Sequence, residues 1–228
     1  MADKKNVQEF DEQVVIEKAK DFWSKYGKLT TIASLIVILV AGGWYAYQNF
    51  VKKPKEAKAV EAMFKAEEYY RLDSVQKALN GDGQHWGFLR VIDKYGGTKA
   101  GNLAHYYAGS CYIKLNENDK AVTHLKKFSS NSKPAEARAY KLLGDAYGDL
   151  GKNKEAVDYY TKAARAFEKE EAFAAECLFN AAYLSQKSLN DTKAAIALYK
   201  EIKEKYPRTQ QGFDADNYLA QMGVYSTE

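Results

Sequence analysis

The chain has 228 residues, a length that suits one domain with appendages. Its 34 basic and 30 acidic residues are interspersed and leave a formal net charge of +4, without the concentrated basic patch of a nucleic-acid binder. Eighteen tyrosines against three prolines favour a packed helical domain over a disordered chain. We therefore expect a mostly folded chain and no nucleic-acid partner.

An uncharged stretch lies between Lys28 and Lys52 and reads LTTIASLIVILVAGGWYAYQNFV over residues 29–51. At about 1.5 Å per residue it reaches roughly 35 Å, enough to cross a bilayer core of about 30 Å. A cleavable signal peptide would have an apolar region of only about 7 to 15 residues. The sequence therefore predicts an uncleaved transmembrane anchor over 29–51, preceded by a short polar tail over 1–28.

The orientation of this anchor is not decided by the lysines on its two sides, because equal numbers flank it. The short tail favours a cytoplasmic N-terminus, with the large C-terminal domain carried across the membrane. We therefore expect a single-pass protein of a bacterial inner membrane with a periplasmic domain. The opposite topology stays open.

A repeated pattern of small and aromatic residues follows the anchor, at a period of about 35 residues. The clearest unit spans 137–170, where the sequence has an aromatic-x2-Leu-Gly-x2-Tyr motif followed by Ala156 and Tyr160. We expect Gly144 and Ala156 to face each other where two antiparallel helices approach closely. The predicted packing positions are Gly109, Ala121, Tyr140, Leu143, Gly144, Tyr147, Ala156, Tyr160, Ala182, Ala195 and Pro207.

The remaining units are placed by the same period. Gly109 and Ala121 define a unit over 102–136, and Ala182 and Ala195 define a more divergent one over 171–207. Residues 52–101 are expected to form a degenerate first hairpin, with helices over 55–80 and 86–95. Residues 208–228 should supply the capping helix and tail that the end of a helical solenoid needs.

These motifs resemble the tetratricopeptide-repeat (TPR) superfamily over roughly residues 55–222. The resemblance implies an all-α fold: an α-solenoid of about three to four helical hairpins plus a capping helix. The whole arrangement is similar to the YfgM-like ancillary subunits of the bacterial SecYEG translocon, which implies a protein that brings periplasmic chaperones to emerging secreted chains. A scaffold subunit of another cell-envelope complex and a cytosol-facing TPR receptor remain alternatives.

Partner contacts are expected on the first helix of each hairpin, because first helices line the concave surface of such a solenoid. The candidates are Leu103, Tyr106, Ser110, Ile113, Lys114, Arg138, Lys141, Asp145, Asp149, Glu176, Phe179, Tyr183, Gln186 and Lys187. Ser110 and Asp145 stand where a TPR clamp for an acidic chaperone tail has asparagine, which argues against that ligand. The mixture of aromatic and charged residues favours an extended or helical apolar segment.

Catalysis has no recognisable motif in this sequence. His85, His105 and His124 lack the i, i+4 spacing of a helical zinc site, and no phosphate loop or nucleophile elbow is present. Cys111 and Cys177 have no metal-ligand spacing, and whether they pair stays open. We therefore predict no enzyme activity, no catalytic residue, no cofactor, no metal and no small-molecule substrate.

Overall fold

A computed structural model describes residues 12–225, and the chain divides into two compact units, Met1–Pro54 and Lys55–Glu228. Helix follows helix through the described part, where the only strand-like pairing is an isolated bridge between Gly81 and Trp86. The all-α prediction is confirmed. Because the two units are separate bodies, each is described by itself.

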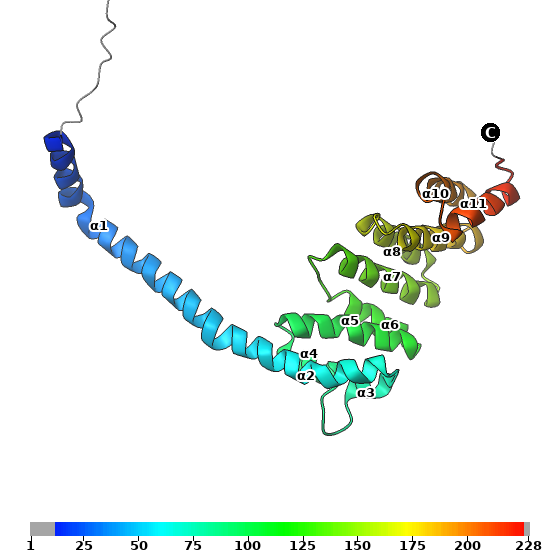
Figure 1. The fold of residues 1–228 in the computed structure, drawn as a ribbon, viewed down its shortest axis with the longest axis horizontal. Helices are drawn as coiled ribbons and strands as arrows, with labels where there is room; N and C mark the ends of the chain where they lie inside the picture. Colours follow the sequence, from blue (N-terminus) through cyan, green and yellow to red (C-terminus); the bar gives the residue numbers. More distant parts are fainter. Residues whose placement is uncertain (1–11, 226–228) are drawn as a thin grey trace, which may run out of the picture. The chain divides into compact units, whose positions relative to one another are not determined.

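The first unit is one long helix, α1 (Glu12–Ala46), which runs directly into a π-helical segment, η1 (Tyr47–Lys52) (Figure 1). By length and composition, this is the one helix among residues 12–225 that could cross a membrane. The hydroxyls of Thr30 and Thr31 donate to carbonyls of the preceding turn, at 2.8 and 2.6 Å. Both hydroxyls are therefore satisfied without water, as a lipid environment requires.

The π-helical turns precede Pro54, which has no backbone N–H to donate. In a regular α-helix the proline ring would press against the carbonyl of Phe50. The wider turns, in which the Lys53 amide donates to the carbonyl of Gln48, relieve that clash. Proline thus explains the change of helical pitch at the end of the apolar segment.

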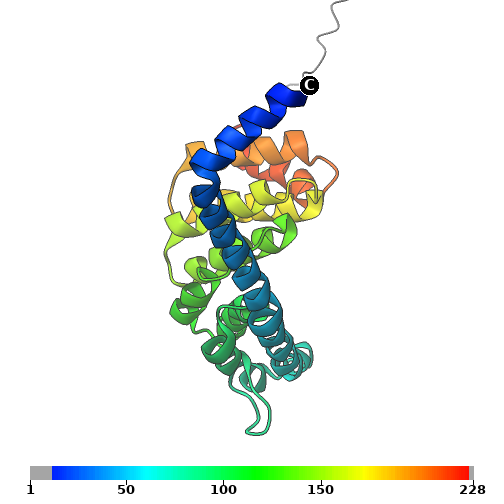
Figure 2. The same ribbon diagram turned by 90° about the vertical axis from the view of Figure 1, so that its left-hand side faces the viewer.

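The second unit is a stack of helical hairpins, shown in two views turned by 90° in Figures 1 and 2. The pairs α5/α6, α7/α8 and α9/α10 follow one another in sequence order, and α11 closes the C-terminal end, as predicted. The helices are α2 (Lys53–Arg71), α3 (Val75–Asn80), α4 (Phe88–Tyr95), α5 (Lys99–Lys114), α6 (Asn118–Leu125), α7 (Lys133–Asp149), α8 (Asn153–Ala166), α9 (Glu171–Lys187), α10 (Thr192–Lys205) and α11 (Gln210–Gln221).

In the hairpins α5/α6 and α7/α8, a side chain of the second helix packs directly against a glycine of the first helix. A Cβ on Gly144 would lie 2.7 Å from the Tyr160 ring, and one on Gly109 would lie 2.5 Å from the Leu125 side chain. The atoms nearest to the Gly144 position belong to Tyr160, one turn beyond Ala156, and in the preceding hairpin Gly109 also approaches the Ala121 carbonyl oxygen, at 3.3 Å. Ala156 lies opposite Gly148, at 4.0 Å from its Cβ position.

The predicted small positions Ala121, Ala156, Ala182 and Ala195 are fully buried, which allows the close approach of the paired helices. The larger predicted packing residues fill the spaces beside them. Leu143, Tyr147 and Tyr160 are buried, Tyr140 is half-buried, and Pro207 follows the end of α10.

The first hairpin differs from its prediction. A single helix was expected over 55–80, but α2 ends at Arg71 and α3 begins at Val75. Asp73 adopts a left-handed backbone conformation with φ 54°, and the Ser74 amide donates to the Tyr69 carbonyl at 2.8 Å. Aspartate tolerates this conformation better than most residues, so the chain turns there without a glycine.

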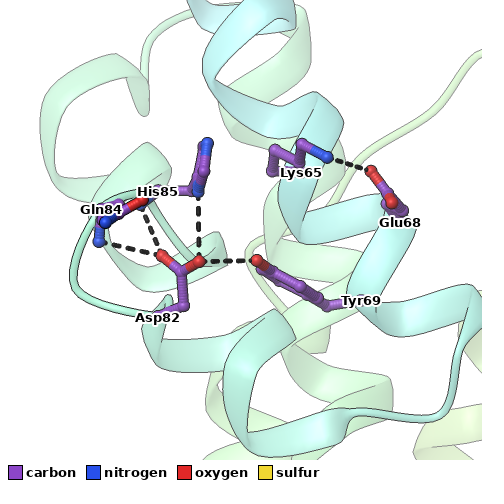
Figure 3. A network of polar contacts seen from close by, with 6 residues as sticks. All are labelled: Lys65, Glu68, Tyr69, Asp82, Gln84 and His85. Atoms are coloured by element: carbon purple, nitrogen blue, oxygen red, sulfur yellow. Dashed lines mark hydrogen bonds and ion pairs between the residues drawn. The ribbon is translucent and has the colours of Figure 1, made fainter.

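The loop between α3 and α4 is fastened to α2 through Asp82 (Figure 3). Its carboxylate accepts hydrogen bonds from the Tyr69 hydroxyl at 2.7 Å and from the backbone amides of Gln84 and His85 at 2.9 and 2.6 Å. The hydrogen bonds from His85 and Tyr69 hold the pKa of Asp82 far below its usual range. The carboxylate is thus an ionised structural anchor for the loop.

Three polar contacts join α5 to α2 and to the turn that follows α2. Near the start of both helices, the Glu56 carboxylate accepts from the first two amides of α5, at 2.8 and 2.9 Å. Further along, the Tyr70 hydroxyl lies 2.7 Å from the Ser110 hydroxyl. At the far end, Lys114 pairs with Asp73 at 2.5 Å. The contacts occur in the same order along both segments, so α2 runs parallel to α5. Since α5 is the first helix of its repeat, α2 is the first helix of the repeat before it.

Candidate partner-binding surface

The candidate site is a surface that we call the first-helix face. It consists of the exposed and half-buried candidate side chains of α5, α7 and α9, together with the side chains of α2 on the same flank. Neighbouring first helices are coupled across it: the polar contacts above join α2 to α5, and Lys141 of α7 pairs with Glu176 of α9 at 3.4 Å. Since α5 also packs against α7, the first helices of successive units lie next to one another and present one row of side chains.

On α5, the face is largely apolar. Leu103, Tyr106 and Ile113 are half-buried and pack against the core beneath. Ser110 is only 7% exposed and is engaged with α2, so in this structure it is closed to a partner. Lys114 is exposed, and its charge is matched by Asp73.

On α7, the face is charged. Lys141 lies 3.3 Å from Asp145, which in turn accepts a hydrogen bond from the Tyr160 hydroxyl at 2.7 Å. Burial, together with the charge of Asp145, raises the pKa of Tyr160, so its hydroxyl stays protonated and continues to donate. Arg138 and Asp149 are exposed at opposite ends of the helix.

On α9, the face becomes aromatic again. Phe179 packs edge-on against Tyr199 and Tyr218, with ring centroids at 5.5 and 5.2 Å. Tyr183 leaves 43% of its surface exposed beside them. The side-chain Oε1 of Gln186 is buried and has no hydrogen-bond partner among the described residues, so it is closed to a partner in this structure. Exposed aromatic surface, as at Tyr183, is a feature of contact surfaces.

The sequence analysis missed the contribution of α2, whose repeat pattern is degenerate. Val60 and Phe64 are each 58% exposed, although their helix packs in the core through Ala59 and Met63. Arg71, the last residue of α2, is also exposed. The available signal was an apolar pair at i and i+4 outside the buried stripe of an amphipathic helix.

Two of the three histidines form a contact within one hairpin. The Nδ1 atoms of His105 on α5 and His124 on α6 lie 3.0 Å apart. Burial lowers the pKa of both imidazoles, that of His124 to about 4, so both are neutral at pH 7 and one donates to the other. Within residues 12–225, no group of three or more potential ligands is arranged to hold a metal ion.

The two cysteines lie apart in the core. Cys111 on α5 and Cys177 on α9 are buried free thiols. Burial raises the pKa of each to about 12, which keeps the reactive thiolate form scarce. In this structure both act as small apolar packing residues.

Comparison with known families agrees with this geometry. A model of a tetratricopeptide repeat-like domain matches residues 20–140, and two further tetratricopeptide-repeat models match residues 137–170 and 176–209. No curated protein matches the chain. Since the first model alone covers more than half of the sequence, the chain belongs to the tetratricopeptide repeat-like domain family.

Proposed function

We propose that the protein is a membrane-anchored interaction module that binds other proteins through the first-helix face and recruits them near the Sec translocon. The observation that carries this proposal is the continuous row of partly exposed aromatic and charged side chains on successive first helices. Tetratricopeptide repeats typically serve as protein-binding scaffolds. Binding to a partner protein accounts for the exposed aromatic and charged residues of this face.

The proposed anchor is the segment 29–51, held in the lipid bilayer of a bacterial inner membrane with the N-terminus in the cytoplasm. Its apolar side chains are exposed along α1, and its threonine hydroxyls are satisfied within the helix. This topology puts the repeat domain in the periplasm, where secreted chains emerge. Exported chains, periplasmic chaperones and translocon subunits are the proposed partners, as the similarity to YfgM-like proteins suggests.

Site-specific crosslinking in native membranes tests the binding face. A photoreactive residue is placed at Tyr106 or at Lys141, with a matched control at Lys154, which is exposed on the second helix α8. We expect translocon subunits, chaperones or exported chains in the products from the first two positions and not from the third. Equal products from Lys154 would reject the face, and products restricted to other envelope-assembly or cytosolic proteins would reject the recruiting role.

A labelling experiment tests the orientation. Both native cysteines are buried, so a cysteine introduced at Lys154 provides the one readily accessible thiol among the described residues. We expect a membrane-impermeant maleimide to label it from the periplasmic side of spheroplasts. Labelling only after lysis of the spheroplasts would contradict the periplasmic placement and support a cytosol-facing receptor.

A further inference from the structure

The part of α1 that precedes the apolar segment has one apolar side. We call its side chains the apolar arc: Val15, Ile16, Ala19, Phe22, Trp23 and Tyr26. The five large ones have exposed fractions from 43 to 61%. At about 100° per residue, all six fall within about 120° around the helix axis. The rings of Phe22 and Tyr26 pack along the arc, with centroids 5.3 Å apart. An exposed apolar stripe therefore leads into residues 29–51.

The charged side chains are ordered around this arc. Residues 15–28 contain four lysines and two carboxylates. By the same turn of about 100° per residue, Lys18 and Lys20 lie about 40° outside the two edges of the arc. Glu17 and Asp21 lie on the opposite side of the helix, each within about 20° of the direction that points away from the centre of the arc. Positive charge therefore borders the apolar arc, and negative charge is farthest from it.

This order of charges fits a lipid surface. A helix in the headgroup region buries its apolar side at the boundary of the acyl chains and keeps its charged side in water. Lysines at the border of the apolar side extend their long side chains towards the lipid phosphates. An anionic surface repels carboxylates, so the side that faces away from it is the favourable place for them. A helix in water, or one packed on a protein, has no physical requirement for this symmetrical order.

The helix α1 is bent in its blue, N-terminal part, as Figures 1 and 2 both show. Hydrogen bonding around Gly27 favours a bend there. The Gly27 carbonyl accepts from the hydroxyls of both Thr30 and Thr31, at 3.1 and 2.6 Å. Hydroxyls that bond back to the preceding turn bend helices, and glycine has no side chain to stiffen the backbone. The segment before Gly27 is therefore able to leave the direction of residues 29–51 without a break in the helix.

From these observations we infer that residues 15–26 lie on the bilayer surface as an amphipathic helix that binds anionic phospholipids. The apolar arc enters the boundary between headgroups and acyl chains, and Lys18 and Lys20 contact lipid phosphates. Tyr26 is three residues before the segment 29–51, so an anchor in the bilayer places the arc at the membrane surface. The inference rests on the proposed anchor and adds a second membrane contact outside it.

Tryptophan quenching in the full-length chain tests the inference. The chain has three tryptophans, so Trp44→Phe with Trp86→Phe leaves Trp23 on the apolar arc as the reporter. The protein is reconstituted in vesicles of phosphatidylcholine and phosphatidylglycerol with acyl chains brominated near the headgroup. A matched reporter on the polar side is Ser24→Trp in a chain whose three native tryptophans are all replaced by phenylalanine.

We expect brominated lipid to reduce the Trp23 emission about twofold or more, because the ring lies at the level of the brominated carbons. Acrylamide, present on both sides of the membrane, should quench Trp23 several-fold less than the reporter at position 24. Equal quenching of the two reporters by acrylamide would place the segment in water and overturn the inference. Protection of Trp23 from acrylamide without quenching by lipid would mean that protein covers the arc, and overturns it as well.

Charge variants test the preference for anionic lipid. In vesicles of phosphatidylcholine alone, brominated lipid should quench Trp23 less than it does with phosphatidylglycerol present. Lys18→Gln with Lys20→Gln should shrink this difference, because the charges that border the arc are lost. Glu17→Gln with Asp21→Asn, on the opposite side of the helix, is the matched control and should preserve it. An undiminished difference in the lysine pair overturns the role of these lysines.

A third reporter separates the surface helix from the proposed anchor. Trp23→Phe with Trp86→Phe leaves Trp44, which lies within residues 29–51. If brominated lipid quenches Trp44 and not Trp23, the anchor stands and the surface helix is rejected. If it quenches neither, the anchor and the surface helix both fail.

Discussion

Gly144→Ala tests whether the central hairpin is limited by close packing. The added methyl group would lie 2.7 to 2.9 Å from three carbons of the Tyr160 ring, which is 7% exposed. The ring cannot move freely, because its hydroxyl donates to Asp145 at 2.7 Å. Alanine should gain about 1 kcal/mol from helix propensity, but overpacking in a dense core costs about 1–3 kcal/mol and strain on the tyrosine hydrogen bond adds to it.

The net expectation for Gly144→Ala is a loss of about 1–2 kcal/mol in the free energy of unfolding. Gly148→Ala is the matched control on the same helix, since its methyl group would meet only the Ala156 Cβ, at 4.0 Å. It should gain about 0.5–1 kcal/mol. Urea unfolding of both full-length variants, followed by circular dichroism, measures the difference. Equal stability of the two variants would refute the packing argument.

A tyrosine variant separates the ring from its tether. Tyr160→Phe removes the hydroxyl bond to Asp145 and lets the ring shift away from the new methyl group. In that background Gly144→Ala should cost less, by a coupling energy of about 0.5–1 kcal/mol. Purely additive effects would show that the hydrogen bond does not hold the ring in place.

Three further outcomes are expected. The pKa of His124 is lowered from 6.5 to about 4 in the folded chain. The free energy of unfolding therefore keeps its full value above pH 6.5 and decreases as the pH falls from there towards 4. With allowance for partial exposure, the decrease is about 1–2 kcal/mol. Urea unfolding at neutral and acidic pH should show this loss in the native chain and a smaller one in His124→Gln. Glu56→Gln should speed hydrogen exchange at the first amides of α5 and destabilise it by about 0.5–1 kcal/mol, whereas Glu61→Gln on the exposed side of α2 should change neither. Cys111 and Cys177 should react with a thiol reagent only in urea, and rapid labelling of the folded chain would contradict their burial.

The regular part of the fold could be predicted because its constraint is local and periodic. Gly109 and Gly144 are 35 residues apart in the sequence, and both are covered by a side chain of the following helix. The motif does not predict which side chain covers the glycine, because that depends on the angle and register at which the two helices cross. Leu125 and Tyr160 occupy this equivalent position, one turn beyond Ala121 and Ala156.

The candidate site was only partly accessible to sequence reasoning. Arg138 and Tyr183 follow from repeat position alone, because exposure on a first helix is periodic. The engagement of Ser110 with Tyr70 depends on how two helices are registered, and no spacing rule contains that information. Phe64 was missed because the repeat pattern of α2 is degenerate, and the helix over 55–80 was predicted too long because the break at Asp73 has no glycine or proline to mark it.

The parallel arrangement of α2 and α5 has a mechanical consequence. A pull along the axis of α2 would load the contacts of Glu56 and Tyr70 in shear, because both join α2 to the parallel helix α5. Contacts loaded in shear share a force instead of opening one after another, so the N-terminal edge of the stack should resist such a pull.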